Sequence, residues 1–477
     1  MKVMSLQTIV LSVQVWRQWI CMLALTFTLG TVGTALAAED ESPPGLHVST
    51  TEVLAGAKAE VSGFRFQPGQ RVTLTLEHAR EGAQPVVVQD NGRFKSKVQI
   101  PHDAKVGVLQ LTAKADGAEV ARTDLMVSKV VPVSGADWFT MTQGKLPPGP
   151  YLAASSADGK AVFVTRSVFK KAPESGIAEA GILKVDTETL KVLDSTTPPV
   201  SPARDDGKNK PAAQSVYAAF GMAADSDNQT LWVTNVLNDT VAAYRQGDLS
   251  LLKQFEPGAV THPHFAQVDA AHHKVYVSSV GDKNVAVIDT QTLKPLKSIN
   301  IDAGEGDKKF VPLGLALDSQ TGTLYVSSME APAIAAIDSA SGKVKKVFTP
   351  LPQAREFQGL AWDAANRLLL VASRGNDNLL VVDPETGKLV HDLYVGAQPL
   401  TVVWEPVSGW AFTANRGAGT VTVVEPKSGK LLANLAVGSF PNHVVADGKG
   451  NVYVINKSKG PDDLKGDLIT RITPKVQ

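Results

Sequence analysis

The chain has 477 residues, 43% of them hydrophobic and 20% charged, a composition typical of a soluble globular protein with roughly two to four domains. Its 47 basic and 47 acidic residues cancel, which excludes attraction to nucleic acid or membranes through overall charge. Any such attraction has to come from a local patch.

The first 37 residues have the pattern of a secretory signal peptide. Lys2 and Arg17 are their only charged residues, an apolar stretch runs from about residue 19 to 36, and "ALA" at 35–37 offers a cleavage site. We expect cleavage after Ala37, with an uncleaved anchor as the alternative, and no transmembrane anchor in the mature chain. Cys21, the single cysteine, leaves with this segment, so we expect no disulfide.

Residues 42–130 are predicted to form a β-sandwich. Apolar and polar residues alternate in short runs, which is the period-two pattern of half-buried strands, and turn residues such as Asp90-Asn91-Gly92 separate them. Six or seven strands at this spacing resemble the immunoglobulin-like modules of bacterial envelope proteins. The runs are 58–64, 71–76, 84–88, 93–100, 108–115 and 120–127.

After residue 148 the sequence becomes periodic, with seven units that each contain pairs of apolar runs and turns. A repeat of roughly 40–50 residues made of strands predicts a β-propeller, and the absence of alternating helices argues against a parallel α/β fold. The residue that ends the "YVTN"-like run of each unit is, in order, Arg166, Asn235, Ser279, Ser328, Ser373, Asn415 and Asn456.

Each unit is predicted to contribute four strands, the first lining the channel. The last unit ends at "LITRITPKVQ" without a fourth strand, and an open sheet edge is a liability. Residues 136–143, "ADWFTMTQ", precede the first unit, and we expect them to supply the missing strand and to close the ring. Trp362 and Trp404 share one position of the first strand in neighbouring units, which predicts packing between blades.

These runs resemble the YVTN-repeat propeller family, seen here as "WVTN", "YVSS" and "YVIN", and most of all its periplasmic YncE-type members. The resemblance spans about residues 138–477; its most specific stretches are 167–181, 228–244, 440–458 and 462–472. It implies a seven-bladed periplasmic propeller at 136–477 with no established catalysis. Single-stranded DNA binding on one face is associated with such proteins, and we carry it over as a hypothesis. The N-terminal sandwich departs from the simplest members.

In a four-stranded blade, the loops between the second and third strands share a face with the loops that enter the first strand. Arg374, Arg416 and Lys457 occupy one aligned position in units five to seven, and Arg166 of unit one lies one position earlier. This predicts a basic arc that binds an anion, because guanidinium groups form paired hydrogen bonds with phosphate or carboxylate. The other residues expected on this ligand-binding face are Asn235, Asn415, His262, His264, Asn442 and His443.

Structural explanations remain open for several of these residues. Each base could be a solvated loop charge or could pair with Asp377 or Asp239. Stacking partners for single-stranded DNA are sparse, since only Phe357 and Phe440 lie near the face. One acidic residue follows the third strand of several units, and we interpret this set as turn caps rather than a metal or acid–base site: Asp186, Asp289, Asp338, Asp383 and Glu425.

The histidines could suggest a metal, but we interpret His262, His264 and His443 as polar channel lining, and His272 and His273 as solvated. The sequence therefore predicts an all-β, exported, monomeric binding protein without cofactor or metal and without catalysis. Two alternatives remain: an envelope scaffold that docks a partner through the sandwich, and a propeller hydrolase or oxidoreductase with a channel metal at His262 and His264.

Overall fold

The computed structural model describes residues 43–475, except 51, 78–84, 170–175, 203–214 and 306–307. The predicted signal peptide, residues 1–37, lies outside the described residues. The chain is all-β and divides into two compact units, the first ending at Lys129 and the second beginning at Val130. Within the described ranges, no helix combines the length and apolar character needed to cross a bilayer.

The first unit contains a three-stranded and a five-stranded sheet that share one hydrophobic core. Burial alternates along the strands as predicted: on β4, Val72, Leu74 and Leu76 point inward and the residues between them do not. The strands, in sheet order, are β1 (Gly45–Val48), β3 (Lys58–Phe64) and β6 (Phe94–Gln99), and β2 (Val53–Leu54), β8 (Ala118–Ser128), β7 (Gly107–Ala115), β4 (Arg71–Leu76) and β5 (Val86–Val87).

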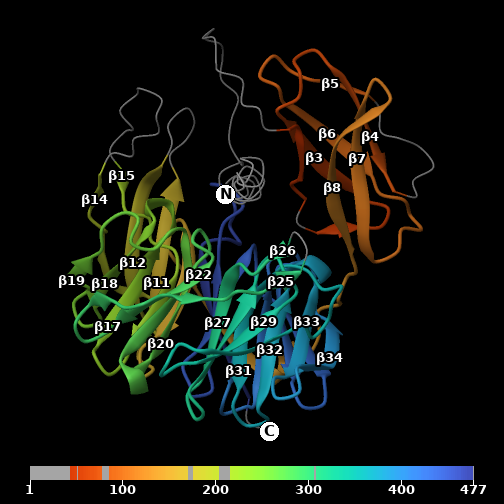
Figure 1. Ribbon diagram of the computed structural model, residues 1–477. Helices are drawn as coiled ribbons and strands as arrows, with labels where there is room; N and C mark the ends of the chain where they lie inside the picture. Colours follow the sequence, from red (N-terminus) through yellow and green to blue (C-terminus); the bar gives the residue numbers. More distant parts are fainter. Residues whose placement is uncertain are drawn as a thin grey trace. The chain divides into compact units, whose positions relative to one another are not determined.

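Among its described residues, the second unit contains seven antiparallel sheets of four or five strands, each built mainly from consecutive strands, which we number sheets 1 to 7 (Figure 1). Sheets 1 to 3 are β10 (Pro150–Ser155), β11 (Ala161–Phe169), β12 (Ile177–Asp186) and β13 (Val192–Thr196); β16 (Met222–Asp225), β17 (Thr230–Asn235), β18 (Thr240–Arg245) and β19 (Leu251–Gln254); and β20 (Pro263–Asp269), β21 (Lys274–Ser279), β22 (Asn284–Asp289) and β23 (Lys294–Pro295), with β24 (Ile299–Asn300) also on β22.

Sheets 4 to 7 follow the same order. They are β27 (Pro312–Asp318), β28 (Thr323–Ser328), β29 (Ile334–Asp338) and β30 (Val344–Phe348); β31 (Phe357–Asp363), β32 (Leu368–Ser373), β33 (Asn378–Asp383) and β34 (Lys388–Tyr394); β35 (Pro399–Glu405), β36 (Trp410–Asn415), β37 (Thr420–Glu425) and β38 (Lys430–Ala436); and β39 (Pro441–Ala446), β40 (Val452–Asn456), β41 (Leu468–Pro474) and β9 (Phe139–Lys145).

Short elements connect these sheets. They are the two-stranded pairs β14 (Val200–Ser201) with β15 (Ser215–Val216) and β25 (Gly304–Glu305) with β26 (Lys308–Lys309), and the single-turn 3-10 helices η1 (Ala136–Trp138), η2 (Val236–Asn238), η3 (Ala270–His272) and η4 (Arg374–Asn376).

The first strands of sheets 1 to 7 contact one another in a cycle. Each touches the first strand of the next sheet, and β39 touches β10. Second strands are buried on both faces because neighbouring sheets cover them; all six residues of β17 are buried. The expected packing of Trp362 between units is confirmed, since its ring stacks on Tyr325 of the preceding sheet with ring centroids 5.5 Å apart.

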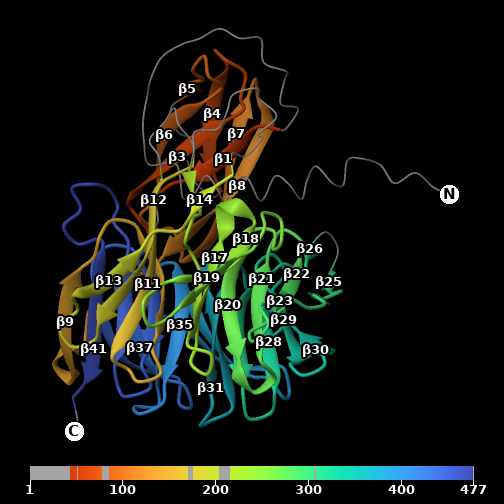
Figure 2. The same ribbon diagram turned by 90° about the vertical axis from the view of Figure 1, so that its left-hand side faces the viewer.

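Strand β9 completes sheet 7 with residues from far upstream, which confirms the prediction for residues 136–143. It pairs antiparallel with β41, Thr142 opposite Arg471, and lies alongside it in Figure 2. Phe139 buries its ring edge-on against Trp410 and Phe412, and Gln143 Nε2 donates to Thr470 Oγ1 at 3.2 Å. The apolar and polar contacts together fix the register of this added strand.

The acidic residues after the third strands cap their own turns, as predicted. Asp186 Oδ1 accepts hydrogen bonds from the backbone of Glu188 and Thr189, and Asp338 Oδ1 accepts from Ser341 N at 2.9 Å and Ser341 Oγ at 2.7 Å. The hydrogen bonds from Ser341 are the main cause that lowers the pKa of Asp338 to about 2. These carboxylates are therefore architectural.

A second acidic column, which the sequence analysis missed, closes the hairpins from first to second strand. Its members are buried; Asp363, for example, accepts a hydrogen bond from Asn366 N at 3.0 Å. A short polar residue that ends a strand and bonds the backbone two or three residues on is the signal for such a cap. The column comprises Asp225, Asp269, Asp318, Asp363 and Glu405.

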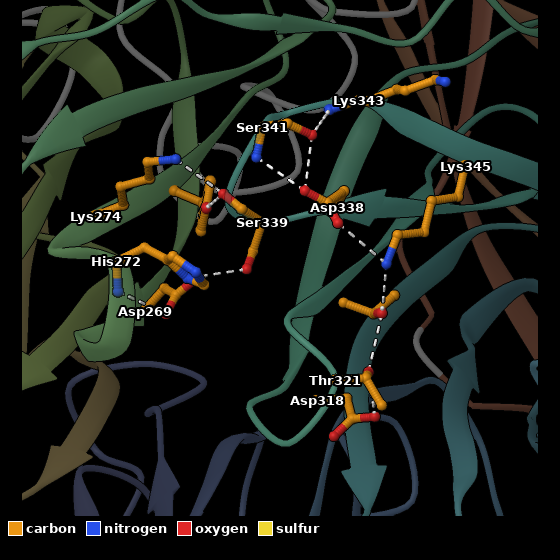
Figure 3. Close-up of polar contacts among 12 residues, drawn as sticks. Asp269, His272, Lys274, Asp318, Thr321, Asp338, Ser339, Ser341, Lys343 and Lys345 are labelled. Carbon is orange, nitrogen blue, oxygen red and sulfur yellow. Dashed lines mark hydrogen bonds and ion pairs between the residues drawn. The ribbon is translucent and has the colours of Figure 1, made fainter.

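His272 is not simply solvated, contrary to expectation. Its Nδ1 lies 2.8 Å from Asp269 Oδ2 and 3.3 Å from Ser339 Oγ of the next sheet, and Lys274 Nζ donates to Ser339 O at 2.9 Å (Figure 3). The imidazole therefore helps to join the turns of sheets 3 and 4. The reason is the burial of Asp269, whose carboxylate requires a hydrogen-bond partner.

Candidate functional site

One backbone feature recurs where the predicted basic residues lie. In sheets 5, 6 and 7, the residue that precedes the first strand has positive φ, and its carbonyl accepts a hydrogen bond from the N–H of the aligned cation. Non-glycine residues with positive φ are uncommon and point to a constrained position. The bonds are Arg374 N to Glu356 O (3.1 Å), Arg416 N to Gln398 O (2.9 Å) and Lys457 N to Phe440 O (2.9 Å).

The guanidinium of Arg416 is held from two sides. It lies over the Phe440 ring, 4.1 Å from the centroid, and its NH1 donates to Asn442 Oδ1. The pKa of Arg416 is lowered to about 10, chiefly by burial; Tyr151 opposes this shift and the charge of Arg374 adds to it. The side chain stays cationic at neutral pH and is oriented before any ligand arrives.

Lys457 sits among aromatic rings. Its Nζ lies 4.4 Å from the centroid of the Tyr151 ring and 5.7 Å from that of Phe169. Within the described ranges no side chain or carbonyl accepts a hydrogen bond from Nζ. Burial lowers the pKa of Lys457 to about 7, and the nearby charge of Arg416 adds to this, while Asp467 acts in the opposite direction.

The negative charge of Asp467 raises the pKa of Lys457, but this carboxylate forms its hydrogen bonds with backbone N–H groups and not with the lysine. Its Oδ1 accepts from Gly149 N and Ser458 N, both at 3.2 Å. Tyr151, in turn, is 9% exposed, and no described residue forms a hydrogen bond with its hydroxyl. Burial raises the pKa of Tyr151, so the phenol is neutral at physiological pH. We call Arg374, Arg416 and Lys457, together with Tyr151, the cationic cluster.

Arg166 already forms an ion pair with a carboxylate. The sequence analysis placed Arg166 at the end of a strand. In the structure β11 continues to Phe169 and pairs with the long strand β12, so Arg166 lies within the strand, beside residues of β12. Its NH2 lies 2.6 Å from Glu179 Oε2, and its Nε donates to Pro148 O at 2.9 Å. Arg374 makes a looser ion pair, 3.5 Å from Glu356 Oε2. Arg166 and Arg374 therefore have carboxylate partners, whereas Arg416 and Lys457 have no ion pair with a described carboxylate.

The other predicted ligand-binding residues divide into two kinds. Asn235 and Asn415 are completely buried, and their amides hold loop backbone: Asn235 Nδ2 donates to Ala218 O at 2.5 Å and Asn415 Nδ2 to Val395 O at 2.9 Å. Asn442 contacts Arg416 directly and belongs beside the cationic cluster. Buried amides of this kind stabilise loops, because leaving their partners unsatisfied is costly.

Two of the three predicted channel histidines, His264 and His443, are held in the neutral form by burial. The rings of His262 and His264 lie 5.1 Å apart, and burial together with His262 lowers the pKa of His264 to about 3. His443 Nδ1 accepts from Ala153 N at 3.3 Å, and burial lowers its pKa to about 4. In the portion of the chain that the structure describes, no three potential ligands gather around one metal position.

The aromatic residues of this face offer little free surface. Phe357 is fully buried. Phe440 has Arg416 over its ring at 4.1 Å and Lys459 at 5.0 Å. Tyr151 and Phe220 pack edge to face with centroids 4.4 Å apart. These rings therefore serve as walls for cations rather than as exposed platforms for bases.

The chain is similar to bacterial proteins named YncE. It is 27% identical over 293 residues to "Uncharacterized protein YncE" of Salmonella typhi, covering 59% of this chain and 74% of that protein. The Escherichia coli K12 protein of that name is 26% identical over the same length, with the same coverage. No protein-family model matches the chain.

Solved structures share the fold of the second unit. Kuenenia stuttgartiensis hydrazine synthase aligns with a TM-score of 0.55 at 17% identity, covering 70% of this chain and 98% of that one. Virginiamycin B lyase of Staphylococcus aureus aligns with 0.52 at 15% identity, covering 70% and 99%. The β-propeller domain of Cps50 (Swd1) from Myceliophteria thermophila aligns with 0.53 at 10% identity, covering 70% and 100%. At these identities the likeness shows a β-propeller fold and nothing more.

Proposed function

We propose that the protein is an exported binding protein whose propeller holds a small anionic ligand at the cationic cluster. The observation that carries this proposal is the pairing of Arg416 with Lys457. Burial and the neighbouring charge of Arg416 lower the pKa of Lys457, and no described carboxylate is hydrogen-bonded to either cation. Buried charges are normally paired, so an anion that bridges them would remove a standing electrostatic penalty.

A compact anion fits this arrangement better than a nucleic-acid strand. A strand bound along an arc would use Arg166 as well, but that base already pairs with Glu179 at 2.6 Å. Single-stranded nucleic acid also needs exposed stacking surfaces, whereas Phe357 is buried and Phe440 is covered by cations. A phosphate or carboxylate needs only the convergence of Arg374, Arg416 and Lys457.

The direct test compares ligands on the purified protein. We expect inorganic phosphate and oxalate to raise the melting temperature and to bind by calorimetry, and Arg416→Gln to weaken binding at least about tenfold through the loss of a charge-assisted bond. Arg245→Gln, which removes an exposed arginine at the far end of β18, should bind as the wild type does.

Two results of this test count against the proposal. Equal affinity in the wild type and in Arg416→Gln would remove the cationic cluster as the site. Tight, salt-dependent binding of a thymidine oligonucleotide of about 15 residues, stronger than binding of phosphate, would replace the small anion with single-stranded DNA.

The finer architecture belongs to the same proposal. We infer that sheets 1 to 7 are the blades of a seven-bladed propeller at 136–477, that the first unit is an immunoglobulin-like sandwich at 42–130, and that residues 1–37 are a cleaved signal for the periplasm. The closed cycle of first strands and the shared core of the first unit support the first two points. N-terminal sequencing of protein from the periplasmic fraction tests the third: an N-terminus at Ala38 is expected, and an intact chain in the membrane fraction argues against it.

A further inference from the structure

Beyond holding an anion, the cationic cluster contains a lysine with the surroundings of a reactive amine. Lys457 Nζ lies over the Tyr151 ring at 4.4 Å, beside Arg416, and its ammonium lacks a hydrogen-bonded carboxylate among the described residues. Lys253 and Lys346 also lie over rings, but their Nζ atoms donate to Leu293 O at 2.5 Å and Glu385 O at 2.6 Å. Lys457 differs from these two because its amine has no acceptor among the described residues, and it differs from Lys459, whose Nζ lies 5.0 Å from the Phe440 centroid, because Lys459 is exposed.

We propose that Lys457 is a nucleophilic amine that captures the carbonyl carbon of a 2-oxo acid whose carboxylate is held by Arg416. The inference rests on the proposed anion-binding function and names the chemical class of the ligand. A carboxylate next to a ketone places its anionic oxygens and its electrophilic carbon within one small molecule. The neighbouring Arg416 and Lys457 supply the matching pair of groups.

The amine can act as a nucleophile because it is neutral for much of the time at physiological pH. Burial and the neighbouring guanidinium lower the pKa of Lys457 to about 7, with Asp467 opposing and Tyr151 contributing a neutral phenol. Desolvation next to a second cation is the established way to activate a lysine amine. Arg416, which remains charged, stacks on Phe440 and bonds Asn442, so its guanidinium is positioned to receive a carboxylate.

The covalent step balances without an added oxidant or reductant. The nitrogen lone pair of Lys457 attacks the carbonyl carbon, the carbonyl π electrons move to oxygen, and a proton passes from nitrogen to that oxygen. A second proton then converts the hydroxyl to water, which leaves as the carbon–nitrogen double bond forms, and the imine nitrogen gives up its proton. Tyr151 carries a hydroxyl with no hydrogen bond to described residues, and it serves as the proton donor and acceptor.

The experiment treats the full-length protein with pyruvate and sodium cyanoborohydride at neutral pH. Reduction of the imine fixes the adduct, and mass spectrometry should show the mass of one pyruvic acid less one oxygen atom on the peptide that contains Lys457, because one water is lost and two hydrogens are gained. Lys457→Arg should abolish the adduct while retaining phosphate binding. Lys294→Arg, which replaces an exposed lysine on β23, should leave the adduct unchanged.

Ligand comparisons keep the test informative if a variant folds poorly. In the wild type, oxalate should compete with pyruvate and lower adduct formation at least about tenfold, and acetone, which lacks a carboxylate, should be trapped at least about tenfold less than pyruvate. Labelling that is spread over several surface lysines, or unaffected by oxalate, overturns the inference. Phosphate binding that depends on Arg416 without any pyruvate adduct would refute the amine chemistry and leave the anion-binding function standing.

Discussion

The buried ammonium of Lys457 should make the stability of the second unit depend on pH above neutrality. In the folded protein its pKa falls from 10.5 to about 7, so the unfolded chain binds more protons between these values. Stability therefore rises with pH across this window; the penalty is present in full below pH 7 and has vanished above pH 10.5. Lys457→Met removes the titrating group and should flatten this rise.

The magnitude follows from the shift in pKa. Each pKa unit corresponds to about 1.36 kcal/mol, so the shift sets an upper limit of roughly 5 kcal/mol. The side chain of Lys457 is partly exposed, and solvent screening reduces the effect to about a third of this limit, about 1–2 kcal/mol. At pH 7 the methionine variant should be more stable than the wild type by about this amount, and near pH 10 most of the difference should be gone.

Urea unfolding followed by tryptophan fluorescence measures this difference for the relevant unit alone. The tryptophans of the described residues all lie beyond Val130, so their emission reports the second unit: Trp138, Trp232, Trp362, Trp404 and Trp410. Lys294→Met, which removes an exposed lysine on β23, serves as the control. If Lys457→Met changed stability by the same amount at pH 7 and near pH 10, the ammonium would not be desolvated, and the reasoning about the cationic cluster would fail.

Three further predictions concern the architecture. A chain that begins at Val130 should retain a cooperative tryptophan unfolding transition, whereas one that begins at Leu146 lacks β9 and should aggregate or lose several kcal/mol, as measured by urea titration. Asn415→Ala should destabilise the second unit by about 2 kcal/mol, because Val395 O loses a donor; a change within error would assign the asparagine to the ligand face instead. His443 is buried in the neutral form with a pKa of about 4, so stability falls as pH drops from 6.5 toward 4, and His443→Gln should reduce that fall in acid urea titrations.

Much of the architecture follows from sequence periodicity. The alternating runs of the first unit correspond to β3, β4, β6, β7 and β8, because a sheet with one buried face imposes a period of two. The missing strand of sheet 7 was predictable, since an unpaired edge demands a partner and residues 136–143 had no other sheet. Repeats also align equivalent loop positions, which is why Arg374, Arg416 and Lys457 could be expected together.

Other parts of the site required the structure. The extension of β11 and β12 past the usual length comes from an insertion, and it pairs Arg166 with Glu179, a residue with no aligned counterpart. Tyr151 was missed although a signal existed: it follows a proline that opens a first strand, as His264 and Asn442 do. Its proximity to Lys457 depends on sheets 1 and 7 meeting, which local sequence does not encode.

The pairing of β9 with β41 also sets the order of events when the protein folds. The hydrogen bond between Gln143 and Thr470 joins residues 327 positions apart, and bringing such ends together costs about 5 kcal/mol of chain entropy by the logarithmic dependence on loop length. This strand pair can form only after residues 468–474 have been synthesised, so the ring stays open until then. Once formed, the β9–β41 pair should slow unfolding, because the closed ring can open only when this pair breaks, and the pair is slow to form again.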